Sequence, residues 1–262
     1  MFNLQRYMFY IGRDLHGLLV RAISLPGVLA KLSSIIAERG LNILYCSTTA
    51  AEEHEEGIIL LFIDFTDSET RPQELAEELR RLDFVREVKL ITPKYEGFIV
   101  DDVSFPLMVG SERAILMTEA ALRGLFIDIR RHIGSGGEAI LYFLGTEVGK
   151  SLAKRYMKMA EEIGVEDLEG KAHIAAGLFV SVGYGLVESL EIDPETPRIR
   201  LRVKGCIECE LGGSAEKPYS QFLRGMLAGY ASVLFKRDMM AKETRCIAMG
   251  DPYCEFEIIS LE

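Results

Sequence analysis

The N-terminal ninety residues show a regular exchange between two kinds of hydrophobic pattern. Apolar residues recur every three or four positions in two segments, 28–36 and 72–82, and this spacing predicts two helices. Short apolar runs predict four strands, at residues 15–23, 41–45, 57–64 and 85–91. The resulting order β-α-β-β-α-β is that of a ferredoxin-like domain. We therefore predict an α+β domain over residues 1–94, followed by a linker over residues 95–110.

The remaining residues, 111–262, predict a mixed α/β domain in which antiparallel hairpins pack on helices. A helical stripe follows Ser111, and a short buried strand is expected at residues 139–144 after the glycine-rich loop 134–137. Further helices and hairpin arms are expected at residues 145–159, 168–182, 186–192, 198–206 and 218–235. The loop 134–137 lacks the Lys-Ser/Thr of a phosphate-binding loop, so we interpret it as a turn.

The last twenty residues hold the most specific chemistry. Cys246 and Cys254 flank a Gly-Asp-Pro turn, and apolar residues alternate after Cys254, so a hairpin would bring the two thiols together. Glu243 could reach the same point and complete a partial metal shell, for which sulfur ligands favour zinc. Two alternatives stay open: buried cysteines without a metal, or an iron–sulfur cluster that also uses Cys206 and Cys209.

Composition narrows the classes of function. Forty acidic against thirty basic residues give a net charge of −10, which disfavours direct binding to nucleic acid. We find neither a signal-peptide pattern nor an apolar run long enough for a membrane helix, so a cytoplasmic protein with reduced thiols is expected. The chain has two asparagines and three glutamines, a depletion typical of thermophiles.

No catalytic motif stands out in the sequence. There is no Gly-x-Ser-x-Gly nucleophile motif, no dinucleotide-binding Gly-x-Gly-x-x-Gly after a strand, and no HExxH metal motif around the four histidines. A reductase would need a source of hydride or electrons, and the sequence shows none. The pattern therefore favours a binding protein over an enzyme.

The N-terminal segment resembles an ACT domain. The similarity is carried by Leu25-Pro26-Gly27-Val28-Leu29 and by Ala37-Glu-Arg-Gly40-Leu41-Asn42-Ile43, although Ser24 stands where the family often has Asp. ACT domains are regulatory modules that commonly bind amino acids before the first helix, usually between two copies. The resemblance implies a homodimer, with a small-molecule site at Leu25, Pro26, Gly27 and Asn42.

The C-terminal segment, from about Ser111, resembles the 4-vinyl reductase domain family. The motif Glu243-x-x-Cys246-x-x-x-Gly250-Asp251-x-x-Cys254-x-Phe256 and the helix Pro218–Ser232 carry the similarity. The family is similar to the sensor domains of aromatic-responsive bacterial activators and to a trafficking-complex subunit. It implies an apolar ligand pocket, often with bound zinc. The family's usual cysteine falls on Ser220, so Cys206 or Cys209 is expected to complete the metal site.

Aromatic residues of this segment are candidates to line the implied pocket, namely Tyr142, Phe179, Phe222 and Tyr230. We therefore expect a ligand-responsive regulatory protein that binds a small apolar or aromatic molecule and contains zinc. Two alternatives remain, a metal-dependent enzyme component such as a reductase and a non-catalytic assembly adaptor. Neither nucleic acid nor membrane is expected as a direct partner.

Overall fold

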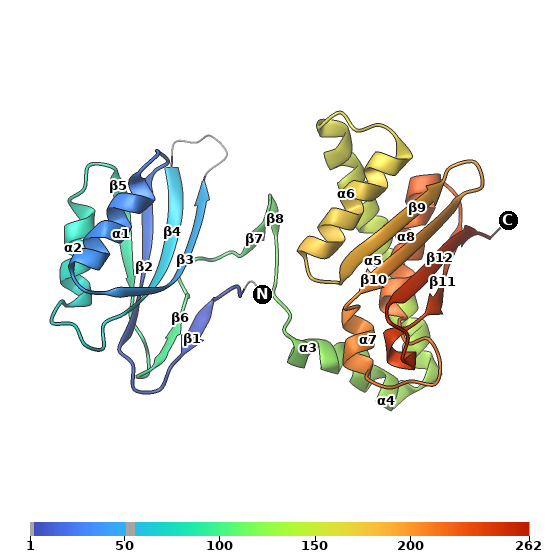
Figure 1. Cartoon of the computed structure of the whole chain (residues 1–262), viewed down its shortest axis with the longest axis horizontal. Coiled ribbons are helices and arrows are strands. Elements are labelled where there is room, and N and C mark those ends of the chain that lie inside the picture. The colour runs from blue at the N-terminus through green and yellow to red at the C-terminus, as the bar shows by residue number, and fades with distance from the viewer. Residues whose placement is uncertain (1–2, 51–55, 262) are drawn as a thin grey trace. The chain divides into compact units, whose positions relative to one another are not determined.

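The computed structural model describes residues 3–50 and 56–261. The chain divides into two compact units, Met1–Ile115 and Leu116–Glu262 (Figure 1). Each unit has its own sheet and its own hydrophobic core. The two units are therefore considered separately below.

The N-terminal unit is built on a four-stranded antiparallel sheet in the order β3-β4-β2-β5. Its elements follow the chain as β2 (Leu15–Ile23), α1 (Val28–Glu38), β3 (Asn42–Ala50), β4 (Glu56–Asp64), α2 (Pro72–Arg80) and β5 (Val85–Ile91). This order and topology are ferredoxin-like, which confirms the predicted fold class of the unit. The positive φ of Gly27 and Gly40 turns the chain at each end of α1.

Both faces of this sheet are covered, which explains the nearly continuous apolar run of β4. Leu61 and Ile63 face the core under the helices, while Leu60 and Phe62 face the opposite side, because successive side chains of a strand alternate. The second face is covered by a small sheet of β1 (Tyr7–Phe9) and β6 (Phe98–Val100), in which Met8 lies opposite Ile99. Residues 98–100 of the predicted linker therefore form part of the N-terminal unit. The linker region also contains a short hairpin of β7 (Met108–Val109) and β8 (Glu112–Arg113).

The C-terminal unit packs helices on a four-stranded antiparallel sheet in the order β11-β12-β10-β9. Its helices are α3 (Glu119–Arg123), a π-helical turn (Gly124–Asp128), α4 (Ile129–Ile133), α5 (Ser135–Glu162), α6 (Leu168–Ser181), α7 (Ile207–Gly212) and α8 (Phe222–Phe235). Its strands are β9 (Leu186–Asp193), β10 (Arg198–Lys204), β11 (Met239–Arg245) and β12 (Cys254–Ser260), with a short 3₁₀ turn at Ile247–Met249. This is the mixed α/β arrangement with antiparallel hairpins that the sequence predicts.

Two local predictions were wrong. Residues 139–144 form no strand but belong to the long helix α5, and residues 135–137 of the glycine-rich loop are its first turn. A six-residue apolar run fits a buried strand or a helix equally well, and here Leu141 is buried while Phe143 remains exposed on the helix surface. The helix expected after Ser111 begins later, at Glu119, because residues 112–113 pair in β8.

Helices α5 and α8 approach each other through glycine on both sides. A Cβ atom on Gly145 would overlap the carbonyl oxygen of Phe222, and one on Gly149 would overlap that of Met226. Gly225 and Gly229 of α8 meet the carbonyl oxygens of Tyr142 and Thr146 in the same way. The two Gly-x-x-x-Gly pairs therefore let the two backbones come into direct contact, which any larger side chain would prevent.

Candidate functional site

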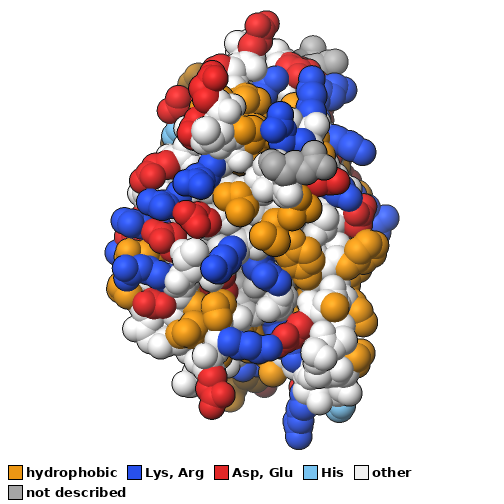
Figure 2. Space-filling view, turned by 90° about the vertical axis from the view of Figure 1, so that its right-hand side faces the viewer, with side chains coloured by type: hydrophobic (Ala, Val, Ile, Leu, Met, Phe, Trp, Pro, Cys, Tyr) orange, Lys and Arg blue, Asp and Glu red, His pale blue; other side chains and the backbone are white. Residues whose placement is uncertain are grey.

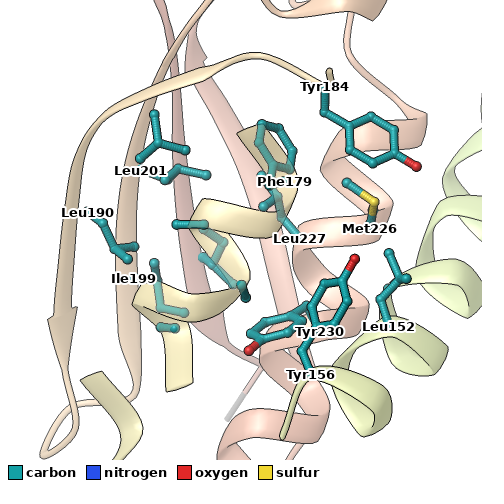
Figure 3. Close-up of a pocket in the computed structure, with 16 residues that line it drawn as sticks. Leu152, Tyr156, Phe179, Tyr184, Leu190, Ile199, Leu201, Met226, Leu227 and Tyr230 are labelled. Carbon is teal, nitrogen blue, oxygen red and sulfur yellow. The ribbon is translucent and has the colours of Figure 1, made fainter. Parts of the chain in front are cut away.

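An apolar cavity of about 70 Å³ lies in the C-terminal unit, enclosed by α5, α6, α8 and the sheet (Figure 3). Helix α5 contributes Leu152 and Tyr156, and α8 contributes Met226 and Tyr230. The remaining wall includes residues of α6, of the loop after it and of the sheet, among them Ala172, Ala175, Ala176, Phe179, Tyr184, Leu190, Ile199, Leu201 and Ile258. The cavity is therefore shaped by two packed helices, a sheet face and one further helix.

The chemistry of the lining is nearly hydrocarbon. Among the described residues, no side chain that lines the cavity is charged at neutral pH, and the polar groups are tyrosine hydroxyls. The hydroxyl of Tyr230 donates a hydrogen bond to the carbonyl oxygen of Lys171, at 3.1 Å. Burial raises the pKa of Tyr184 and of Tyr230, so both hydroxyls remain neutral over the physiological range. An ionised ligand would lose its hydration here without finding a counter-charge.

The structure brings two of the four predicted pocket residues to the cavity. Phe179 and Tyr230 line it, as does Tyr156, which the sequence did not single out. Tyr142 instead packs beneath the guanidinium of Arg224, at 4.8 Å from the ring centre. Phe222 lies at the start of α8, where its ring packs against that of Phe126 with 5.4 Å between the ring centres. These two aromatic rings fill the packed end of the helix pair, away from the cavity lining.

A separate cluster of buried thiols and one carboxylate could hold a metal ion. Cys209, Glu243, Cys246 and Cys254 are buried, and each offers one ligand atom within 4.8 Å of the others. The Sγ atom of Cys209 lies 3.4 Å from Oε1 of Glu243 and 3.6 Å from Sγ of Cys246. Cys209 comes from α7, Glu243 from β11, and Cys254 opens β12. The cluster therefore joins three elements that are distant in sequence.

The remaining predicted ligand, Cys206, lies directly beside this group. Its Sγ atom is 3.5 Å from that of Cys209, and its side chain is fully buried at the start of α7. Hydrogen bonds from Cys209 and Cys254 lower the pKa of Cys206 to about 6. The hydrogen bonds that Cys209 makes with Cys206 raise its own pKa. Five potential donors thus lie together, of which four form the compact group.

Electrostatics show what such a cluster requires. Burial raises the pKa of Glu243 to about 8, and the neighbouring Cys246 thiolate adds to this increase. Several groups that become anionic are therefore confined in a space from which water is excluded. Such groups must keep their protons or share a cation. Three sulfur atoms and one carboxylate form a donor set that fits a soft or borderline divalent ion in tetrahedral coordination.

Ser220 occupies the position where the related family has a cysteine, and the structure shows its alternative role. The backbone N–H of Ser220 donates to Oε2 of Glu243 at 2.9 Å, and its hydroxyl donates to Glu208. Ser220 therefore orients the carboxylate of Glu243 instead of adding a sulfur atom. The sulfur of Cys209, from a different element, lies in the compact group.

A buried ion pair next to the cluster was not foreseen from the sequence. Arg130 of α4 pairs with Glu208 of α7, and the two side chains are 9% and 0% exposed. Glu208 also accepts N–H bonds from residues 221, 222 and 223 at the start of α8. The guanidinium of Arg130 stacks on the ring of Tyr219 at 4.2 Å. Since the pair spans 78 residues of sequence, no local pattern indicates it.

The candidate ACT site is less enclosed. Asn42 lines a shallow hollow between α1 and β3, together with Ser33, Ser34 and Ala37. Leu25 is 60% exposed before α1, and Gly27 there adopts a φ of 91°. Leu25, Pro26 and Gly27 are outside the lining of this hollow, so the structure does not gather the four predicted residues around one enclosed space.

The surface gives no sign of a single basic face. On the side of the molecule shown in Figure 2, lysine and arginine side chains alternate with acidic ones and with small groups of hydrophobic residues. On the outer face of the C-terminal sheet, Arg200 and Arg202 pair with Glu257 and Glu255. Within the described residues, no helix has the length and apolar character that crossing a bilayer requires.

Comparisons with known proteins agree with these two units. A family model for the ACT domain matches residues 16–84, and one for the vinyl-4-reductase domain matches residues 199–260. The chain therefore contains an ACT domain and a vinyl-4-reductase domain, as the sequence resemblances indicated. An uncharacterized protein of Methanocaldococcus jannaschii is 28% identical over 133 residues, which are 51% of this chain and 71% of that protein.

The structure is also similar to two solved structures. The phenol-responsive sensory domain of the transcription activator PoxR, bound to phenol, aligns with a TM-score of 0.53 and 20% identity. The alignment covers 59% of this chain and 80% of that domain. A vinyl-4-reductase family protein of Methanocaldococcus jannaschii aligns with a TM-score of 0.39 and 23% identity, over 58% of this chain and 85% of that protein. At this identity the likeness to the PoxR domain describes the fold alone.

Proposed function

We propose that this chain is a ligand-responsive regulatory protein whose vinyl-4-reductase domain binds a small, neutral, apolar or aromatic molecule. The observation that carries the proposal is the apolar cavity between α5, α6, α8 and the sheet. Pockets for small molecules are typically apolar with a few placed polar groups, which is the chemistry found here. The fold likeness to a phenol-responsive sensory domain supports the same interpretation.

The lining defines the class of ligand. Carboxylates, ammonium groups and phosphates are disfavoured, because no side chain of opposite charge lines the cavity within the described part of the chain. A single unsubstituted or hydroxylated ring suits the lining of leucine, isoleucine, alanine and tyrosine residues. A hydroxylated ring could exchange hydrogen bonds with the tyrosine hydroxyls.

We further propose that a zinc ion is bound by Cys209, Glu243, Cys246 and Cys254. Four protein ligands fill a tetrahedral shell and leave no open position for substrate, so the ion would be structural. It would fasten α7 to β11 and β12 and so stabilise the unit that contains the cavity. Iron in place of zinc would instead favour the alternative of a redox-active enzyme component.

For the ACT domain we propose a regulatory and dimerising role in a cytoplasmic protein. Strand β3 is an edge of its sheet, nine residues long, so its outer backbone groups are available to pair with another strand. Binding of an amino acid near Leu25, Pro26, Gly27 and Asn42 would couple to that assembly. Sedimentation of the full chain with and without a panel of amino acids tests both parts.

The ligand proposal is tested with three matched one-ring molecules: benzene, phenol and benzoate. Benzene and phenol are expected to raise the unfolding midpoint of the C-terminal unit in proportion to log concentration, since a ligand of the folded state stabilises it by mass action. Benzoate, which differs by one charged group, is expected to have no effect. Equal stabilisation by all three, or by none, would exclude a neutral apolar site. In the latter case an assembly adaptor becomes the better account.

A further inference from the structure

The cavity is smaller than the ligand class that its lining selects. A cavity of about 150 Å³ lined by Leu, Ile and Phe binds benzene. The cavity of this protein measures about 70 Å³, roughly half of that. The closed cavity therefore has room for an atom such as xenon but not for an aromatic ring. One wall has to move before a ring can enter.

Two of the walls are poorly suited to movement. Strands β9, β10 and β12 are joined by continuous antiparallel pairing, which fixes the sheet side. On the opposite side, Gly145 and Gly149 of α5 are in backbone contact with α8, so separating these helices would open a void between them. The remaining wall is helix α6, which brings Ala172, Ala175, Ala176 and Phe179 to the cavity (Figure 3).

Helix α6 is attached lightly along its length. Of its fourteen residues, Ala172 and Phe179 are buried. The side chains of Ala172, Ala175 and Ala176 are small, so moving α6 outward would expose little apolar area for each residue. Glycine in the left-handed region occurs on both sides of the helix, at Gly164 before it and at Gly183 after it. A Cβ atom at either position would meet no neighbour, so these glycines serve backbone conformation and not close packing.

One hydrogen bond fastens α6 across the cavity. The hydroxyl of Tyr230 on α8 donates to the backbone carbonyl of Lys171 in the first part of α6, at 3.1 Å. Lys171 also forms an ion pair with Glu161 at 3.4 Å, but Glu161 is 60% exposed and such a pair contributes little. The bond from Tyr230 therefore spans the edge of the cavity that would open.

We propose that α6 is a lid over the cavity, held closed by the hydrogen bond from Tyr230 to Lys171, and that an aromatic ligand binds by displacing it. This inference rests on the proposed ligand site and adds how that site is opened. A displaced α6 would change the exposed surface of the domain when ligand is bound. The position of α6 would then report occupancy to a partner.

The test uses hydrogen exchange of the full-length protein, read by mass spectrometry in peptides that cover residues 165–185, with xenon and benzene as probes. Xenon should bind without changing exchange in α6, whereas benzene should accelerate it to a saturable limit. Tyr230→Phe removes the tether and should raise the population of the open form about two- to tenfold, with an equal gain in benzene affinity. Tyr184→Phe removes a hydroxyl from the same cavity and should leave both quantities unchanged within about twofold.

The outcomes separate the lid from the ligand site. Benzene binding with unchanged exchange in α6 and equal affinity for Tyr230→Phe would overturn the lid and keep the site. Binding of neither xenon nor benzene would overturn the proposed function, and the lid with it. Equal gains in Tyr230→Phe and Tyr184→Phe would show that polarity of the cavity, and not the tether, controls affinity, which also contradicts the lid.

Discussion

Replacing Gly145 by alanine tests the packing that forms the floor of the cavity. The added methyl group would overlap the carbonyl oxygen of Phe222 in the backbone of α8, where no side chain can rotate away. Both helices would have to separate, although the contacts of Gly225 and Gly229 hold them together at the same crossing. Gly145 does not line the cavity, so the effect measures the helix contact itself.

The magnitude follows from two opposing contributions. Overpacking a well-filled interior costs about 1–3 kcal/mol and occasionally more. Alanine recovers up to about 1 kcal/mol of helix propensity. We therefore expect Gly145→Ala to lower the free energy of unfolding by about 1–3 kcal/mol, which corresponds to roughly 2–12 °C in a unit of this size.

The matched control is Gly177→Ala in the middle of α6. A Cβ atom there would meet no neighbouring atom, so propensity alone acts, and a gain of about 0.5–1 kcal/mol is expected. Hydrogen exchange of α5 and α8 peptides in increasing guanidinium measures the unfolding free energy of this unit separately from the ACT domain. If Gly145→Ala proves neutral or stabilising, like the control, the close backbone contact of α5 with α8 is refuted.

Three further predictions concern the metal cluster, the buried ion pair and pH. Cys209→Ser should abolish stoichiometric zinc in elemental analysis, whereas the same change at the exposed Cys46 should not; zinc retained in Cys209→Ser would assign the fourth ligand elsewhere. Arg130→Gln should lower the unfolding free energy of the C-terminal unit by about 3–5 kcal/mol, because it leaves the carboxylate of Glu208 buried and unpaired, while Arg131→Gln on the exposed side should change it little. Burial lowers the pKa of His16 despite the opposing influence of Asp14, so the folded ACT domain binds the proton less readily than the unfolded chain, whose histidine titrates near pH 6.5. Its stability should therefore fall as pH decreases through about 6.5 toward the folded-state pKa, and His16→Gln, but not His132→Gln, should flatten this dependence in chemical denaturation.

The fold of the ACT domain could be predicted because its elements are separated by clear turns. Gly27 and Gly40 mark the ends of α1, and the apolar run of β4 is too short for anything but a buried strand. In the C-terminal domain the run 139–144 had a similar length but lay inside a helix of 28 residues. Its neighbours decide the outcome, because the backbone contact of Gly145 with α8 requires α5 to be helical there.

The metal cluster could be predicted more closely than the cavity. The hairpin around Gly250 and Asp251 brings Cys246 and Cys254 together by local turn geometry, and Asp251 accepts the N–H of Cys246 at 2.8 Å. The choice between Cys206 and Cys209 depends on how α7 is oriented, which no local pattern fixes. For the cavity, Tyr142 and Tyr156 lie on nearly the same face of α5 but about 21 Å apart along it. Which turn faces the cavity depends on where α6 crosses, and that is a tertiary contact.

The central claim is that the vinyl-4-reductase domain binds a small apolar molecule in the cavity beneath α6. The most direct test is calorimetric titration of benzene into the full-length protein and into two matched variants. Ala176→Leu places a larger side chain in the cavity lining, and Ala139→Leu places the same side chain on the exposed surface of α5. We predict saturable binding of one benzene per chain to the wild type and to Ala139→Leu, weakened about tenfold or more in Ala176→Leu. Absence of saturable binding, or equal affinity in all three proteins, would contradict the account.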